Sequence, residues 1–172
     1  MAELSGLTRR ELLGGASLGG LAVAATLAGP AASVQAQGAG SGLSLAAAQT
    51  MINAAIAKAR EIGVPMTVVV VDDGGNLKAA ARMDGSGFGG IEIVLRKAVT
   101  AAGFRSSTQA LGDRAQSDPA RLASFANLPH IWLGGGGLPV MRGGELLGGS
   151  GAGGGTPEQD TEVAQAGVAA FS

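Results

Sequence analysis

Four charged side chains lie directly after the two apolar runs of one short stretch of this 172-residue sequence, VVVVDDGGNLKAAARMDG at residues 68–85. Asp72 and Asp73 follow one apolar run, and Arg82 and Asp84 follow the next. Asp, Gly and Asn favour tight hairpin turns, so turn formation accounts for Asp73 without any further function. A calcium site is disfavoured because the loop pattern D-x-[DN]-x-[DN]-G is absent. Arg82 either pairs with Asp84 and braces the loop or binds an anion.

A glycine-rich segment near the end of the sequence, GSGAGG at residues 149–154, matches the pattern G-x-G-x-x-G. A dinucleotide fingerprint also needs a further strand and an acidic residue about 20 residues on, and the sequence offers no such context. Two interpretations remain. Backbone N–H groups of a loop around Gly149 and Gly151, with the dipole of the last helix, bind a carboxylate or phosphate. Alternatively, the small residues only allow close packing.

The single histidine, His130, lies in the segment NLPHIWLGGGG. It is a candidate haem-iron ligand, a general base, or a structural side chain held by hydrogen bonds. One histidine excludes a multi-histidine metal site within one chain. The absence of cysteine excludes disulfides, thiolate ligands and a cysteine nucleophile. A serine triad is disfavoured because no G-x-S-x-G segment is present.

The composition limits the partners of this chain. Charged residues make up 15 % of the sequence and the net charge is −1, so we expect no nucleic-acid surface, which needs clustered lysine and arginine. Aromatic residues make up 3 %, so a core must be built from Ala, Val, Leu and Ile. The length suits one domain.

The N-terminal segment has the features of an export signal. Arg9 and Arg10 form a twin-arginine pair, residues 12–36 carry no charge, and Val34-Gln35-Ala36 is a cleavage site of the A-x-A type. We therefore predict a signal peptide at 1–36, a linker at 37–42 and a domain at 43–172. The protein would be periplasmic or secreted after removal of the signal, with the twin-arginine export machinery as a partner. The alternative is an uncleaved membrane anchor.

Periodicity and turn residues predict the order helix, two strands, helix, three strands, helix. Because no parallel βαβ alternation runs through it, the order favours an α+β fold with an antiparallel sheet. A capping box of Thr156 and Gln159 begins the last helix. The predicted helices are 45–61, 91–102, a short one at 107–111, and 156–171; the predicted strands are 66–71, 77–83, 131–133, 138–141 and 145–149; residues 118–129 are expected to be irregular.

These motifs together resemble the GlcG/HbpS family of haem-binding and haem-degrading-type domains. The resemblance covers residues 43–172 and is carried by VVVVDDGGNLKAAARMDG, RKAVTAAGF with a following SST, GGGGLPV, and GGELLGGSGAGGGTPEQD. It implies a five-stranded antiparallel sheet flanked by helices, similar to profilin-like domains. It also implies haem as a ligand, often bound where subunits meet, and a homo-oligomer.

Several side chains are candidates for holding haem. Lys97 and Thr100 match the KAxTA segment of the family, and on a helix they are neighbours that can address one ligand, with Lys97 beside the apolar face. Haem also needs an apolar slot, an iron ligand and cations for its propionates. The slot would be lined by Val94, Ala98, Ala101 and Phe104; the iron ligand would be Thr100, Thr108, Met83 or His130; the propionates would meet Arg82, Arg96, Lys97 or Arg105.

Three functions therefore remain open. The first is an exported haem-binding protein. The second is an enzyme or accessory protein for a small organic acid, with Arg82 and the 149–154 segment holding the carboxylate and Lys97 or His130 as the acid–base group. The third is a ligand-free, oligomer-forming structural domain. The sequence does not decide whether there is any catalysis.

Replacing both Arg9 and Arg10 with lysine should leave the precursor in the cytoplasm, because the twin-arginine pair is the feature that the export machinery reads. Cell fractionation followed by detection of the unprocessed precursor measures this outcome. Unchanged export of the double variant would show that the protein uses another route.

Overall fold

The computed structural model describes residues 42–171, so the expected signal peptide and nearly all of the linker lie outside the described residues. The described part contains nine helices and strands in this order: α1 (Leu45–Glu61), β1 (Thr67–Asp72), β2 (Leu77–Arg82), α2 (Gly90–Phe104), α3 (Thr108–Gln116), α4 (Pro119–Ala126), β3 (Gly137–Arg142), β4 (Glu145–Gly153) and α5 (Pro157–Ala169). No helix in this part is both long enough and apolar enough to cross a membrane.

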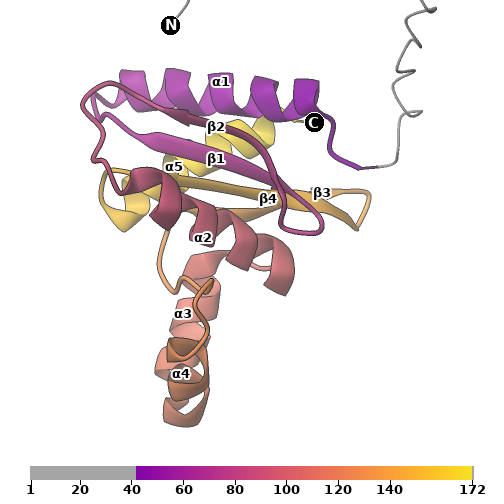
Figure 1. Cartoon of the computed structure of the whole chain (residues 1–172), viewed down its shortest axis with the longest axis vertical. Coiled ribbons are helices and arrows are strands. Elements are labelled where there is room, and N and C mark those ends of the chain that lie inside the picture. Colours follow the sequence, from indigo (N-terminus) through magenta and orange to yellow (C-terminus); the bar gives the residue numbers. More distant parts are fainter. Residues whose placement is uncertain (1–41, 172) are drawn as a thin grey trace, which may run out of the picture. The chain divides into compact units, whose positions relative to one another are not determined.

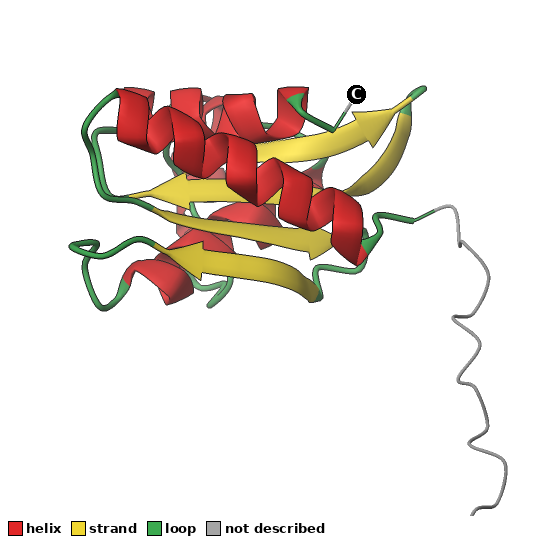
Figure 2. Cartoon of the chain, turned by 90° about the horizontal axis from the view of Figure 1, so that it is seen from above, coloured by secondary structure: helices red, strands yellow, loops and turns green. Residues whose placement is uncertain are grey.

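The four strands form one antiparallel sheet in the order β2-β1-β4-β3. Helices α1 and α5 cover one face of the sheet and α2 covers the other, while α3 and α4 extend beyond α2, away from the sheet (Figure 1). The view from above in Figure 2 shows helices on both sides of the strands. The predicted α+β class with an antiparallel sheet is confirmed.

The prediction of a fifth strand was wrong. Residues 131–133 do not pair with a neighbouring strand, because their backbone donors are used elsewhere. The N–H of Ile131 donates to the carbonyl of Leu128, and the N–H of Trp132 donates to Thr100 Oγ1 at 2.9 Å. A side chain on α2 has thus replaced a strand as the partner of this segment.

Residues 119–126 also differ from expectation, since they form α4 within a segment predicted to be irregular. The Asp118 side chain accepts the N–H groups of Ala120 and Arg121, and Pro119 occupies the first turn. An Asp-Pro pair of this kind is a helix start signal. The predicted capping box is confirmed: Thr156 and Gln159 form it completely at the start of α5.

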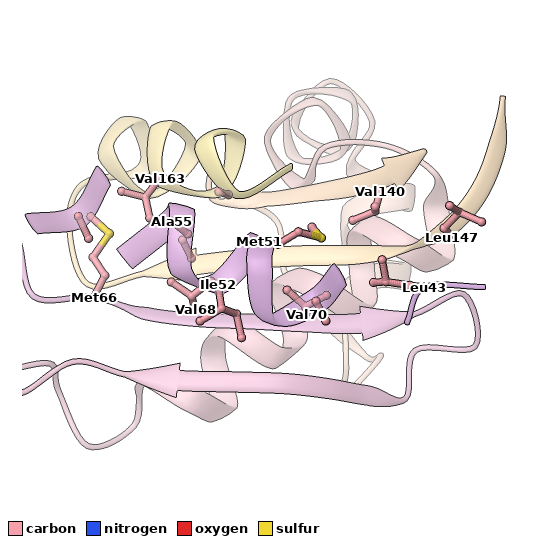
Figure 3. Close-up of a cluster of buried hydrophobic side chains, with 14 residues drawn as sticks. Leu43, Met51, Ile52, Ala55, Met66, Val68, Val70, Val140, Leu147 and Val163 are labelled. Carbon is pink, nitrogen blue, oxygen red and sulfur yellow. The ribbon is translucent and has the colours of Figure 1, made fainter. Parts of the chain in front are cut away.

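The core consists of small aliphatic side chains on both faces of β1. Val68 and Val70 pack toward α1 and α5, together with Met51 and Ile52 (Figure 3). The alternate valines of β1, at positions 69 and 71, pack against α2. Because β1 lies between β2 and β4 and is covered on both faces, its sequence is continuously apolar rather than alternating.

The hairpin between β1 and β2 is built by Asp72. Its carboxylate accepts the backbone N–H groups of Gly74 and Asn76, at 3.1 and 2.8 Å. The positive φ of this turn falls on Gly75, at +78°, while Asp73 is exposed. Asp72, the last residue of β1, therefore holds the turn in which Asp73 lies, and this is the turn that the sequence predicted.

The segment GSGAGG is mostly strand β4 and not the predicted loop. Gly149, Gly151 and Gly153 face α2. The helix backbone occupies the space where side chains at 149 and 151 would stand, and the Val94 side chain of α2 occupies it at 153. A Cβ atom at Gly151 would lie 2.5 Å from the carbonyl oxygen of Val94. The close-packing interpretation of these glycines is therefore the one the structure supports, and the loop interpretation was wrong.

Gly151→Ala should destabilise the fold by roughly 1–3 kcal/mol, because the added methyl group must push α2 away from β4. Gly103→Ala, within α2, is the matched control, since a Cβ atom there meets nothing within 4 Å. That control should be neutral or stabilising by up to about 1 kcal/mol. Urea unfolding of both variants measures the difference, and equal stabilities would contradict this account of the glycines.

Candidate functional site

The outward side of α2 forms one wall of a cavity of about 380 Å³, called the outer cavity below. Its described lining is Gly75, Glu92, Leu95, Arg96, Val99 and His130. The walls contributed by Leu95 and Val99 are aliphatic, whereas His130 supplies an exposed imidazole. Arg96 pairs with Glu92 through one nitrogen, Nη2, so other N–H groups of its guanidinium remain for a ligand.

Thr100 holds the segment that carries the histidine. Its hydroxyl donates to the carbonyl of His130 at 3.2 Å and accepts the N–H of Trp132 at 2.9 Å. The Thr100 side chain is buried, and its one hydroxyl proton is already donated to the His130 carbonyl. The structure therefore shows Thr100 positioning His130 and Trp132, and of these three residues only Thr100 lines neither of the cavities described here.

A second cavity, of about 490 Å³, lies at the N-terminal end of α2 and is called the Trp132 cavity below. Its wall contains a buried ion pair between Lys97 Nζ and Asp160 Oδ2, 2.6 Å apart. The remaining lining comes from α2, the end of β4 and the residue after it, the loop before α2 and the 131–133 segment: residues 86–90, Ile93, Val94, Trp132, Gly153 and Gly154.

The ion pair is held by further contacts on both sides. Lys97 Nζ donates to the carbonyl of Ala152 at 3.0 Å and lies 5.6 Å from the centre of the Trp132 ring. Asp160 Oδ1 accepts the N–H of Gly155 at 2.9 Å. Every charged oxygen and nitrogen of the pair thus has at least one partner, as buried charges require.

Lys97 is therefore buried, and its ammonium and the Thr100 hydroxyl have different protein partners, although helical spacing makes the two residues neighbours. Its partner Asp160 was missed by sequence reasoning. A signal was present: Asp160 occupies the same helical stripe as the buried Val163, Ala164 and Gly167 of α5. An acid in a buried stripe needs a cation, and Lys97 is that cation.

Arg82, Thr108 and Phe104 make structural contacts and are not part of the described lining of either cavity. Arg82 donates through Nη1 to the carbonyl of Ser86, and Asp84 is not its ion-pair partner among the described residues. Thr108 is buried, and its hydroxyl accepts the N–H of Gly137 at 3.0 Å. Phe104 packs edge-on against Phe125, with ring centres 5.4 Å apart.

Two further features concern the charged side chains of the described residues. Within residues 42–171, no group of three or more His, Cys, Asp or Glu side chains is placed to hold a metal ion. Hydrogen bonds that Lys58 donates to Glu162 and Glu61 hold the pKa of Lys58 above its usual value. Lys58 lies on α1, across the sheet from both cavities.

A four-stranded antiparallel sheet, covered by helices and carrying two cavities along α2, defines a small α+β domain. The family model described as "Haem degrading protein HbpS-like" matches residues 43–169. The chain therefore belongs to the HbpS-like family, which confirms the resemblance found in the sequence.

The relatives that match this chain differ in length and in how much of their length the match covers. An uncharacterised 15.0 kDa Citrobacter freundii protein, from the dhaT–dhaS intergenic region, is 40 % identical over 131 residues, covering 76 % of this chain and 92 % of the relative. The corrinoid adenosyltransferase PduO of Salmonella typhimurium is 32 % identical over 123 residues. That match covers 71 % of this chain but only 37 % of PduO.

Solved structures of similar domains share the fold. A double mutant of Streptomyces reticuli HbpS matches with a TM-score of 0.70 and 31 % identity, covering 76 % of this chain and 87 % of HbpS. A complex of PduOC with haem matches with a TM-score of 0.71 and 32 % identity, covering 75 % of this chain and 94 % of PduOC.

Thr100→Val should destabilise the protein by about 1–3 kcal/mol, because it removes a buried hydroxyl and leaves the N–H of Trp132 without its acceptor. Thr50→Val on α1 is the matched control, since the exposed Thr50 hydroxyl only bonds to the carbonyl of Ala46. Its effect should stay within about 0.5 kcal/mol. Chemical denaturation compares the two, and a Thr100→Val variant as stable as Thr50→Val would contradict the bracing role.

Proposed function

We propose that this domain binds haem in the outer cavity, with His130 as the iron ligand. One observation carries the proposal: the only histidine of the chain lines the same cavity as Leu95, Val99 and Arg96. Membership of the HbpS-like family and the haem complex of the similar PduOC domain support haem as the ligand.

The residues present fit the chemical needs of haem. An imidazole is a common axial ligand for haem iron, the aliphatic walls suit the macrocycle, and a guanidinium pairs well with a propionate. The cavity volume lies within the range of roughly 300–1,000 Å³ that small-molecule sites occupy. Bound haem would supply the iron chemistry, while the chain itself would hold and orient the group.

Among the candidate iron ligands, His130 is favoured over Thr100 and Thr108. Both threonine hydroxyls are buried and engaged with the backbone of the 130–137 segment. His130 is exposed, and the hydrogen bond that the Thr100 hydroxyl donates to the His130 carbonyl fixes the backbone of this residue. The geometry therefore gives the imidazole access to a ligand and gives the His130 backbone a defined position.

We extend this proposal to location and assembly. The twin-arginine motif at Arg9 and Arg10 supports export of the protein before it meets haem outside the cytoplasm. The family resemblance supports a homo-oligomer. The Arg96 side chain at this cavity is 39 % exposed, so one chain alone would leave part of the haem in solvent. A second copy would cover that part.

Haem titration of the purified protein tests the proposal. The parent should show a saturable Soret shift, and its stoichiometry should report whether one chain or two hold each haem. His130→Ala should lose the spectrum of imidazole-ligated iron. Arg96→Gln should weaken haem binding by roughly 10–100-fold, the effect of losing a charge-assisted hydrogen bond.

Arg60→Gln is the matched control for Arg96, since Arg60 is exposed on α1, on the opposite face of the sheet. It should leave haem affinity unchanged. If His130→Ala keeps the parental spectrum and affinity, the iron ligand is another group and the outer cavity is not the haem site. A broad response that never saturates in the parent would show adsorption in place of binding.

A further inference from the structure

The Trp132 cavity is a second built site, separate from the one proposed for haem. Its wall holds two charged side chains that are nearly removed from solvent, with Lys97 5 % and Asp160 7 % exposed. Burying two charges is costly, and a well-packed apolar pair is often as stable or more stable. A retained ion pair at the wall of a cavity therefore suggests a role in binding.

The hydrogen-bond donors of this wall are not all used. An ammonium group carries three N–H donors, and the Asp160 carboxylate and the Ala152 carbonyl take two of those on Lys97. The third has no oxygen acceptor among the described residues. The indole N–H of Trp132 likewise has no acceptor in that part of the chain. Spare donors at the wall favour a ligand that brings acceptor oxygens.

The rest of the cavity is apolar. The Trp132 ring, Val94 and Ile93 line it, and Ile93 is 41 % exposed although it is aliphatic. Phe88, on the glycine-rich loop at the rim, is fully exposed. Exposed apolar side chains around a cavity indicate that the ligand also has an apolar body.

We propose that the Trp132 cavity binds a small monocarboxylate with an apolar body, whose carboxylate accepts a hydrogen bond from Lys97. The Lys97 ammonium would then bridge two carboxylates, that of the ligand and that of Asp160. The N-terminal turn of α2 lies in the same wall and has no side-chain cap, so its dipole favours an anion there. This site goes beyond the proposed haem function and does not depend on it.

The chain offers a direct probe, because Trp132 is its only tryptophan and lines this cavity. Titration of the purified full chain with hexanoate should give a saturable change in tryptophan fluorescence. Hexanamide has the same apolar tail but no charge, and it should bind at least about tenfold more weakly, the loss expected for one charge-assisted hydrogen bond.

Two variants assign the site to the ion pair. Asp160→Asn removes the competing carboxylate, so hexanoate should bind more tightly. Lys97→Met combined with Asp160→Leu removes both charges together, which avoids leaving one buried charge unpaired, and should weaken hexanoate binding about tenfold or more. Lys58→Met is the matched control, since Lys58 is also paired with acids but lies on α1. It should leave hexanoate affinity unchanged.

The absence of a saturable response, or equal affinity for hexanoate and hexanamide, would overturn the proposal. So would a folded Lys97→Met/Asp160→Leu protein that binds hexanoate as the parent does. If that double variant does not fold, the comparison of hexanoate with hexanamide on the parent protein decides, because it leaves the buried pair intact. Unchanged or weaker hexanoate binding by a folded Asp160→Asn protein also contradicts the bridging geometry. Haem titration of Asp160→Asn should match the parent, so failure at one cavity is distinguishable from failure at the other.

Discussion

Helix α2 lies so close to strand β4 that side chains at three alternate positions of the strand would collide with the helix. Glycine at 149, 151 and 153 makes this approach sterically acceptable. The approach brings Lys97 of α2 to the end of β4, beside the carbonyl of Ala152 and the start of α5. Both cavities lie along α2, so their positions depend on the same close packing.

The Lys97–Asp160 pair joins α2 to α5 around the end of the sheet. Removing one partner of a buried pair leaves an uncompensated charge, at a cost of about 3–5 kcal/mol. The pair as a whole need not add to the free energy of folding, because desolvation of both groups offsets their attraction. Its structural contribution is to fix where α5 begins relative to α2, and therefore the shape of the Trp132 cavity.

The segment from His130 to Trp132 connects the two cavities. His130 lines the outer cavity, Trp132 lines the other, and the hydroxyl of Thr100 bonds to the backbone of both residues. This segment is not paired in the sheet, and the Thr100 side chain of α2 is the partner that bonds to the backbone at both of its ends. An aromatic ring and an imidazole two residues apart thereby line different cavities in a domain with few aromatic residues.

The sequence alone determined the features that depend on local order. Helical periodicity, the capping box of Thr156 and Gln159 and the Asp-Gly-Gly-Asn turn specified α1, α2, α5 and the β1–β2 hairpin, and the family motifs identified the family. Only the tertiary structure paired Lys97 with Asp160, 63 residues away. It also made the Thr100 hydroxyl the hydrogen-bond partner of the 131–133 segment and placed the 149–153 glycines in a strand. Local patterns report propensity and amphipathicity, whereas these contacts depend on which distant backbone fills the space beside a residue.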